Sequence, residues 1–321
     1  MSTDRTPTSP GQETASDAGP DGRAWGPDRR VALPASTGLP WLARRVARWG
    51  LVTAGRPAAR ARMLPGFLIV GAERCGTTSM FGVLRQHPAV FNGTLPRKEV
   101  HYFDHKYHHG LGWYQCHFPL TARTRLAARG TGAAPVAFEA TANYMFHPLA
   151  PARIHRDLPG VRLLVLVRDP VERAYSAHAH QVGYGYETEP FERALELEDS
   201  RLEGEAEHLA ADPAYASFSH DHHTYRARGH YADQLEHLER TFGRDRIHVV
   251  DSDDFFADPG PAYDQVLDFL GLPAHTPAFT PQNARPRAPM PDTLRTALQE
   301  HYRPHDERLA TWLGHQPSWR R

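Results

Sequence analysis

The sequence predicts a single α/β domain in which a parallel β-sheet is flanked by helices. Two observations predict this class. Short apolar runs such as 66–71 and 161–167 are typical of strands that are buried on both faces of a parallel sheet. Segments with helical periodicity alternate with these runs, as they do in α/β domains. With 321 residues, 40% of them hydrophobic, the chain can fill one substantial core.

The folded domain is expected over residues 65–315, and its elements follow in chain order. We predict buried strands over 66–71, 135–139, 161–167 and 246–251. We predict helices from 77 to just before 88 and over 169–183, 230–243, 261–273 and 291–313. The helix after the third strand has the strongest start signal. Asp169 is expected as its N-cap, Pro170 at its first position, and Glu172 where a capping box needs a carboxylate.

Two segments precede this domain. Half of residues 1–40 are Gly, Pro, Ser or Thr without apolar periodicity, which predicts a disordered tail. Residues 41–64 form a basic amphipathic segment, with six arginines between Trp41 and Arg62. This segment would attract an anionic substrate or make weak contact with a membrane surface. The alternative, which we favour, is a helix packed on the outside of the domain, because a surface apolar stripe usually faces a core.

Composition excludes several classes of protein. Lys+Arg and Asp+Glu both number 37, so the net charge is +0 and no nucleic-acid partner is expected. Cys75 and Cys116, the two cysteines, cannot build a disulfide framework or a four-thiolate zinc site. No apolar run reaches the roughly 18 residues of a transmembrane segment, and the first 22 residues lack a signal-peptide core. We therefore expect a cytoplasmic protein.

The stretch G-A-E-R-C-G-T-T-S over 71–79 is the most informative motif. A strand enters a glycine-bounded turn and a helix leaves it, so backbone N–H groups and the helix dipole form an anion cradle. Gly71 and Gly76 keep the spacing of a nucleotide phosphate loop, but Thr77 stands where that loop has lysine. Arg74 carries the positive charge instead. Such a loop suits a terminal group of lower charge than a triphosphate; the alternative is an ordinary strand–helix turn.

A second anion site is predicted where the strand 161–167 ends. Arg168 follows this strand and Ser176 lies two turns into the next helix. The carboxyl ends of strands are where ligands bind in open α/β sheets. Asp169 is better explained as a helix cap than as a magnesium ligand, because Arg168 beside it would oppose a cation. Two separated anion sites suit a nucleotide that is phosphorylated at both its 5′ and 3′ positions.

Four blocks together resemble the sulfotransferases that use 3′-phosphoadenosine 5′-phosphosulfate (PAPS), and most resemble the glycan-modifying branch that includes heparan sulfate sulfotransferases. The blocks are IVGAERCGTTSM, KEVHYFD with the following HHGLGWY, LVLVRDPVERAYSAHAH, and RGHYADQLEHLERTFGRDRIHVVDSDDFFADP. Two departures are visible. Arg74 stands where much of the branch has lysine, and Glu-Ala-Thr-Ala over 139–142 replaces Glu-Lys-Thr-Pro of some members. The second departure weakens the case for heparan sulfate itself as the acceptor.

The resemblance implies a phosphate-loop-like site for the 5′-phosphosulfate, with PAPS as donor, 3′,5′-adenosine bisphosphate as product and no metal. It implies in-line transfer of the sulfuryl group to a hydroxyl of a carbohydrate or glycosylated natural product, with Arg74 neutralising charge on the leaving oxygen. Animal members of the branch are membrane-anchored, whereas this chain shows no anchor, so an intracellular acceptor is expected. The residues placed at the donor are Arg74, Cys75, Gly76, Thr77, Thr78, Ser79, Arg168, Ser176, Arg228 and Tyr231.

The resemblance places the catalytic base on Glu99. If residues 98–104 are extended, Glu99, His101 and Phe103 share one face. His101 is the competing base because it titrates nearer neutrality, or it positions the acceptor. The alternative for this segment is an exposed strand with an incidental charge. Lys98 is one of two lysines among 37 basic residues, and we expect it to contact the donor or an anionic acceptor.

The acceptor cleft is expected to include residues that follow a strand end, together with a lid from the Pro-rich stretch. The residues are Glu139, Asn143, Tyr144, Arg285 and Arg287. For some residues an alternative stays open. Tyr231 could belong to the core, and Cys75 is either a nucleophile of lowered pKa or, as we favour, a small loop filler. His220, His222 and His223 suggest a metal site, but their spacing matches no zinc pattern.

Two other functions stay open at this point. A phosphate-loop kinase is disfavoured by Thr77 and by Arg168. A non-catalytic binder of an anionic glycan or nucleotide would keep Arg168 and Ser176 but would not need Glu99. The sequence leaves open which acceptor is used, whether O- or N-sulfation occurs, and the oligomeric state.

Overall fold

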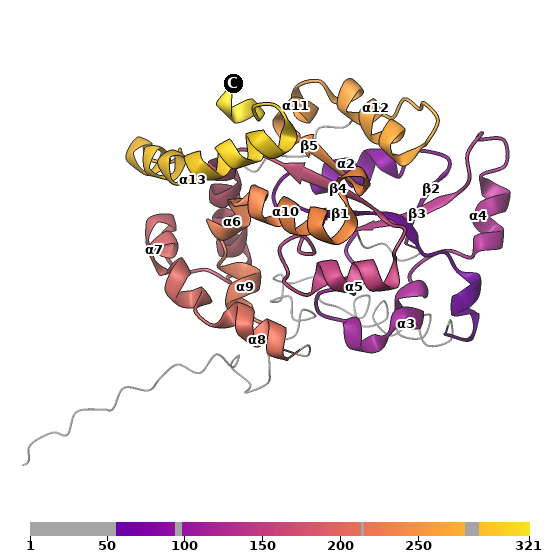
Figure 1. The fold of residues 1–321 in the computed structure, drawn as a ribbon, viewed down its shortest axis with the longest axis horizontal. Coiled ribbons are helices and arrows are strands. Elements are labelled where there is room, and N and C mark those ends of the chain that lie inside the picture. The colour runs from indigo at the N-terminus through magenta and orange to yellow at the C-terminus, as the bar shows by residue number, and fades with distance from the viewer. Residues whose placement is uncertain (1–55, 94–97, 213–214, 280–288) are drawn as a thin grey trace, which may run out of the picture.

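The computed structural model describes residues 56–93, 98–212, 215–279 and 289–321. Within these residues five parallel strands form one sheet in the order β2-β3-β1-β4-β5 (Figure 1). The strands are β1 (Pro65–Gly71), β2 (Val90–Asn92), β3 (Val136–Ala140), β4 (Arg162–Val167) and β5 (Ile247–Asp251). The predicted α/β class with a parallel sheet is confirmed. The edge strand β2 was not predicted, because three residues are too few to show a period.

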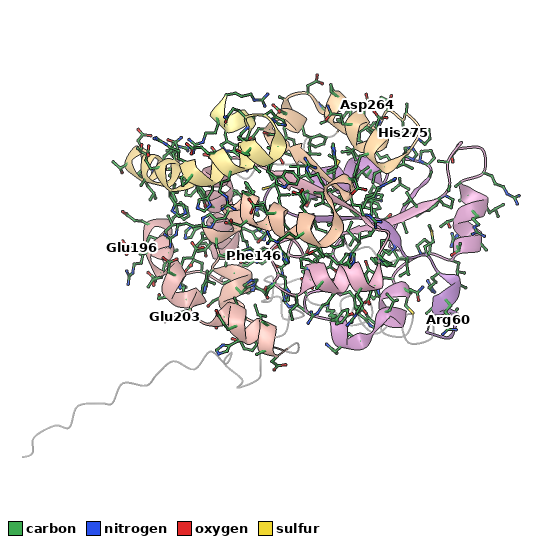
Figure 2. The ribbon with its side chains drawn as sticks, viewed as in Figure 1. Arg60, Phe146, Glu196, Glu203, Asp264 and His275 are labelled. Carbon is green, nitrogen blue, oxygen red and sulfur yellow. The ribbon has the colours of Figure 1, made fainter. Side chains whose placement is uncertain are left out.

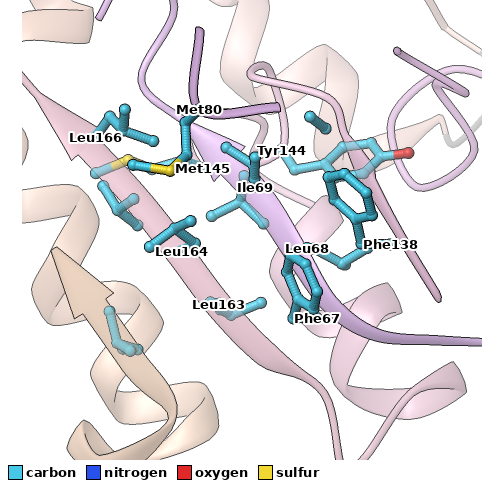
Figure 3. Close-up of a cluster of buried hydrophobic side chains, with 14 of the residues drawn as sticks. Phe67, Leu68, Ile69, Met80, Phe138, Tyr144, Met145, Leu163, Leu164 and Leu166 are labelled. Carbon is cyan, nitrogen blue, oxygen red and sulfur yellow. The ribbon is translucent and has the colours of Figure 1, made fainter. Parts of the chain in front are cut away.

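The core lies around the central strands β1 and β4. Phe67, Leu68 and Ile69 are fully buried, and Leu68 is in register with Leu163 of β4. Figure 3 shows these side chains packed against those of β3, where Phe67 stacks on Phe138 with ring centroids 4.8 Å apart. Both faces of β1 are covered, which is why its sequence is a continuous apolar run rather than an alternating one.

Helices cover both faces of the sheet. In Figure 1, α5 and α10 lie together on one face, while α2 and α12 lie on the other side of the strands. The longer helices are α2 (Thr77–Leu84), α5 (Ala150–Asp157), α6 (Pro170–Tyr184), α7 (Phe191–Leu202), α10 (Tyr231–Phe242), α12 (Pro259–Leu270) and α13 (Asp292–Leu313). Shorter ones are α3 (Leu111–Gln115), α4 (Thr121–Ala127), α8 (Glu205–Ala211), α9 (Phe218–His222) and α11 (Ser252–Ala257). The five predicted helices are confirmed.

The start of α6 follows the predicted chemistry. Asp169 is the N-cap, and its side chain accepts a hydrogen bond of 2.9 Å from the backbone N–H of Val171. Pro170 is at the first helical position, where its missing N–H costs nothing. Glu172 accepts from Arg295 of α13 at 2.7 Å, so it also ties the C-terminal helix to α6.

The sheet order places a topological switch point at the carboxyl ends of β1 and β4. The chain leaves β1 toward β2 and β3 on one side, and β4 and β5 lie on the other side. Connections diverge at such a switch point, which is where open α/β sheets bind ligands. The loop after Gly71 and the turn at Arg168 both open there, because they follow directly on these two strands.

The segments at both ends of the chain lie outside the predicted domain of residues 65–315. The predicted tail and most of the basic segment, residues 1–55, lie outside the described residues, and residues Arg56–Ala61 form a short 3-10 helix, η1. Packing continues past residue 315, because Ser318 donates to Asp251 at the end of β5 and Trp319 packs against the core. Among the described helices, none has both the length and the apolar character needed to cross a bilayer.

Candidate active site

The loop after β1 forms an anion-binding geometry at the start of α2. Gly76 is the N-cap with a φ of 79°, and a Cβ at this position would lie 2.9 Å from the ring of Phe256. Only glycine fits both requirements. Among the described residues no side chain caps α2. The N–H groups at the start of a helix lie at the positive end of its dipole and can bind an anion. In α2 the N–H of Ser79 already donates to the Gly76 carbonyl at 2.9 Å.

Lys98 supplies a positive charge at this helix start. Its Nζ donates to Thr77 Oγ1 at 2.8 Å and to Thr78 Oγ1 at 3.2 Å, and its side chain is 18% exposed. Burial lowers the pKa of Lys98, while the neighbouring Glu99 opposes this effect. Thr77 occupies the position of the phosphate-loop lysine in sequence, and Lys98 brings an ammonium group to that place from a different segment.

Arg74 joins the two predicted anion sites. Its backbone has a φ of 67°, and its Nε donates to Ser176 Oγ of α6 at 3.2 Å. One of its terminal nitrogens lies 3.5 Å from His180 Nδ1, one turn further along α6. Arg168, at the end of β4, is partly exposed with its Nε 3.9 Å from Asp253. The structure therefore brings Arg74 and Ser176, one residue from each predicted anion site, into contact.

Glu99, His101 and Asp104 form a chain of charges beside Lys98. His101 Nε2 lies 3.4 Å from Glu99 Oε2, and His101 Nδ1 lies 2.8 Å from Asp104 Oδ2. Burial opposes the charge on His101, but the two carboxylates outweigh it and raise the pKa of His101 to about 10. Burial opposes the charge on Glu99 as well, but His101 and Lys98 lower its pKa to about 2. At neutral pH, Glu99 is therefore a carboxylate and His101 an imidazolium.

A hydrogen-bonded network contacts the charged residues Glu99, His101 and Asp104 through Asp104. Asn143 Nδ2 donates to Asp104 at 3.1 Å, and Arg228 donates to Asn143 Oδ1 at 2.9 Å. His105 Nε2 lies 3.3 Å from Asp221 Oδ2. Arg228 also lies 3.6 Å from Glu73 in the loop, and its guanidinium covers the ring of Phe146, labelled in Figure 2, at 4.5 Å. The network connects α9 and the segment before α10 to the loop after β1.

The extended conformation predicted for residues 98–104 is wrong. His101 has a left-handed backbone with a φ of 56°, and a turn follows it. The backbone N–H of Val100 donates to Glu139 Oε2 at 3.1 Å and to Thr141 Oγ1 at 3.2 Å, so buried side chains hold the segment in place of a neighbouring strand. Phe103 consequently points into the core, whereas Glu99 and His101 remain next to each other.

Glu139 and Tyr144 do not line the surface of the cleft. Their exposed fractions are 2% and 0%, and Tyr144 donates to Glu139 at 2.9 Å. Glu139 also accepts from Tyr114 and Thr141, and its burial raises its pKa. These two residues lie beneath the segment that carries Glu99, and we propose that they hold it in position. Asn143 lies in the network described above.

Cys75 and Tyr231 form part of the wall behind the loop. Cys75 Sγ lies 3.4 Å from the hydroxyl of Tyr231, which donates to the backbone carbonyl of Arg168. Burial raises the pKa of the Cys75 thiol to about 11, so it is a thiol rather than a thiolate at neutral pH. This supports the filler interpretation. Tyr231 is buried, as the core alternative expects, and it links the loop to the end of β4.

The histidines considered as a metal site do not come together, and the arginines of the predicted lid are not described. His220 stacks on Phe146, His222 Nδ1 lies 3.1 Å from Gln181 and His223 Nε2 lies 3.0 Å from the Tyr186 carbonyl, so these three imidazoles do not converge on one point. Arg285 and Arg287 lie outside the described residues, and their predicted lid stays a prediction.

Sequence reasoning missed Asp104, His105, His180 and Asp221. Asp104 stands three residues after His101 within the same block, so an i, i+3 contact in a turn was the available signal. His180 lies one helical turn after Ser176, on the same face of the helix. His105 and Asp221 come from separate segments, and no local pattern indicates that they meet.

A helix start with basic side chains around it and a carboxylate beside it is an arrangement that suits the transfer of an anionic group. A sequence profile of the sulfotransferase domain matches residues 64–289, more than half of the chain. The chain therefore belongs to the sulfotransferase domain family. The predicted resemblance is confirmed at the level of the family.

Named relatives agree with this assignment. The chain is 28% identical over 295 residues to heparan sulfate glucosamine 3-O-sulfotransferase 6 of Homo sapiens, covering 84% of the chain and 77% of that protein. It is 27% identical over 294 residues to the bifunctional heparan sulfate N-deacetylase/N-sulfotransferase 4 of Mus musculus, covering 80% of the chain but only 31% of that protein. A sulfotransferase crystal structure from Alicyclobacillus acidocaldarius superposes with a TM-score of 0.60 at 28% identity, covering 81% of the chain and 100% of that structure.

Proposed function

We propose that the chain transfers a sulfuryl group from PAPS to a hydroxyl of a carbohydrate or glycosylated small molecule. One observation carries this proposal. Lys98 Nζ lies 2.8 Å from Thr77 Oγ1 at the start of α2 and 3.5 Å from the Glu99 carboxylate. A cation for the donor and a base for the acceptor are therefore adjacent. The carbohydrate class of acceptor is supported by relatives whose names describe enzymes of heparan sulfate.

The residues fit this donor at both of its charged ends. The first-turn N–H groups of α2, the hydroxyls of Thr77 and Thr78 and the ammonium of Lys98 would hold the 5′-phosphosulfate. Arg168 and Ser176 would hold the 3′-phosphate at the end of β4. Arg74 belongs to the loop proposed for the 5′-phosphosulfate and contacts Ser176 of the site proposed for the 3′-phosphate. Its guanidinium would therefore stabilise negative charge at either end of the donor.

The chemistry depends mainly on position and charge. When bound, the donor supplies a sulfuryl group whose bond to the 5′-phosphate oxygen breaks as a bond to the acceptor oxygen forms. Glu99 accepts the proton of the acceptor hydroxyl, a step worth about 10²–10⁴ in rate. Lys98 neutralises the charge that develops on the leaving oxygen. His101 is protonated at neutral pH, so we assign it to holding Glu99 rather than to accepting the proton.

Ligand binding tests the donor. Saturating 3′,5′-adenosine bisphosphate, at about a hundred times its Kd, should stabilise the wild-type chain by about 2.7 kcal/mol in a thermal melt. Equal concentrations of 5′-AMP should stabilise it less, and Ser176→Ala should reduce the gain from the bisphosphate. Stabilisation by Mg·ATP, with none by the bisphosphate, would contradict the proposal and favour a kinase.

Turnover tests the base. Glu99→Gln should keep the bisphosphate-induced stabilisation but lose at least about a hundredfold in the rate of sulfated product formed from labelled PAPS and a carbohydrate acceptor panel. Glu196→Gln is the matched control, because Glu196 lies exposed on α7, as Figure 2 shows, and pairs only locally with Arg193. Equal rates in the two variants would remove Glu99 from the mechanism. Donor binding with no turnover of any acceptor by the wild type would favour a non-catalytic binder.

A further inference from the structure

Three histidines meet on the side of the molecule where α13 packs against the start of α10. His230 is the residue directly before α10, and His301 and His305 lie four residues apart on one face of α13. One ligand-type nitrogen of each of the three rings lies within 4.8 Å of the others. The proposed sulfuryl transfer uses none of these residues, although His230 lies within the fourth sequence block.

The approach of the rings is close. His230 Nε2 lies 3.0 Å from His301 Nε2, and the rings of His230 and His305 are parallel with centroids 3.8 Å apart. Zinc ligands at about 2.0–2.1 Å from the metal stand roughly 3.3 Å from one another in a tetrahedral site. The nitrogens of His230 and His301 are near this spacing, whereas the stacked rings of His230 and His305 would have to rotate out of their parallel arrangement, because imidazole binds a metal in its ring plane.

The backbone around the cluster is held firmly. Gly229 lies so close to Tyr302 of α13 that a Cβ at this glycine would lie 2.7 Å from the ring. The Tyr302 hydroxyl donates to the backbone carbonyl of Arg226 at 3.2 Å. These contacts fix the segment that carries His230 against the helix that carries the other two histidines, so the three rings are brought together by the fold.

The charged groups around the cluster have opposite signs. Asp233 of α10 lies 3.8 Å from His305 Nδ1, and it also pairs with Arg308. Arg226 is the nearby cation, and its guanidinium is paired with Glu198 and Asp199. The positive charge beside the cluster is thus offset by carboxylates, and Asp233 adds negative charge next to His305.

We propose that His230, His301 and His305 bind one zinc ion that joins α13 to the start of α10. Imidazole nitrogens are preferred zinc ligands, and three protein ligands leave one tetrahedral position for solvent. The ion would stabilise the fold by fixing the segment around His230 against α13. This segment includes Arg228 before His230 and Tyr231 after it. The proposal does not depend on the sulfuryl-transfer proposal.

Zinc uptake by the full chain, prepared without a histidine tag and stripped with a chelator, tests the site. Wild type should bind one zinc more per chain than His301→Asn or His305→Asn, measured by equilibrium dialysis and elemental analysis. The affinity of each variant should fall by more than about tenfold, the loss that follows even from removing an outer-shell partner of a zinc ligand. Zinc should also raise the melting temperature of the wild type and not of the variants.

His315→Asn is the matched control, because His315 is an exposed histidine just beyond the end of the same helix. It should bind zinc as the wild type does. Titration of the wild type with Co²⁺, read by its visible absorption, needs no variant and covers the case in which a variant fails to fold. No zinc bound by the wild type at micromolar concentration, or equal binding by wild type and both cluster variants, would overturn the proposal.

Discussion

Glu99 and His101 show how single residues set the charge of this site. Each side chain would be costly to bury alone, yet each is stabilised by the other and by its neighbours Lys98 and Asp104. The result is an ionised carboxylate held between two cations. At neutral pH Glu99 is in the form that accepts a proton and His101 is not, but a pKa of about 2 also makes the Glu99 carboxylate a weak base.

The raised pKa of His101 predicts a particular pH dependence of stability. His101 has a pKa of about 10 in the folded chain, against an ordinary value of 6.5. A group whose pKa is raised by folding contributes stability below its unfolded pKa and loses that contribution as pH rises through its folded pKa. The stability of the wild type relative to His101→Gln should therefore be largest below about pH 6.5 and should shrink steadily toward pH 10.

Thermal melts of both proteins from pH 6 to 10 would measure this difference. His108→Gln provides the control, because His108 is exposed in the same part of the chain and should show no such trend relative to wild type. A constant difference between wild type and His101→Gln over this range would show that His101 is not charged by its carboxylate partners.

At the scale of elements, helix starts position the anion sites. Two strand–helix junctions, after β1 and after β4, carry the residues that we propose for the donor. The first begins with a glycine and no side-chain cap, so N–H groups at its start can bind an anion. The second is capped by its own Asp169, so its function depends on side chains such as Arg168 and Ser176.

Removing the cap of α6 should weaken the fold by a defined amount. Asp169→Ala deletes the acceptor of the Val171 N–H bond. The cost should be about 0.5–2 kcal/mol, as for other N-cap substitutions. Each kcal/mol corresponds to roughly 2–4 °C in the melting temperature of a chain of this size class.

Asp258→Ala is the matched comparison for this prediction. Asp258 stands at the same N-cap position of α12, but its side chain makes no capping hydrogen bond there. A thermal melt should show a much smaller loss for this variant than for Asp169→Ala. Equal losses would mean that the cap of α6 contributes nothing specific.

At the scale of the whole molecule, the sheet order decides which residues meet. The strand order brings the carboxyl ends of β1 and β4 together, although Gly71 and Val167 are 96 residues apart in sequence. The side chains around these two strands are buried in the main hydrophobic core. Arg74 and Ser176 meet at the carboxyl ends of the strands.

A cavity in the central sheet should therefore destabilise the whole domain. Leu164 on β4 is fully buried in the cluster of Figure 3. Leu164→Ala should cost about 2–5 kcal/mol, the range for truncating a buried leucine. Leu126 is 60% exposed on α4, so Leu126→Ala should stay within about 0.5 kcal/mol of wild type. A thermal melt of the two variants would compare them, and similar losses would contradict the assignment of the core.

Several features of the site could be predicted from sequence because they depend on neighbouring residues. The spacing of Gly71 and Gly76, the Arg168–Asp169–Pro170 turn and the position of Ser176 in its helix are local patterns with local causes. Residues 98–104 could not be predicted in the same way. Their conformation depends on buried hydrogen bonds that the Val100 N–H donates to Glu139 and Thr141, about 40 residues away.

The sequence alone determined the parallel α/β class, the glycine-bounded loop and the capped helix, since burial periodicity, glycine φ angles and caps are properties of a few consecutive residues. Only the tertiary structure decided that Lys98 lies at the start of α2, that Glu139 and Tyr144 lie beneath the site, and that His230 meets His301 and His305. The physical reason is that these contacts join segments far apart in the chain. Their geometry depends on strand order and helix packing, which no local pattern contains.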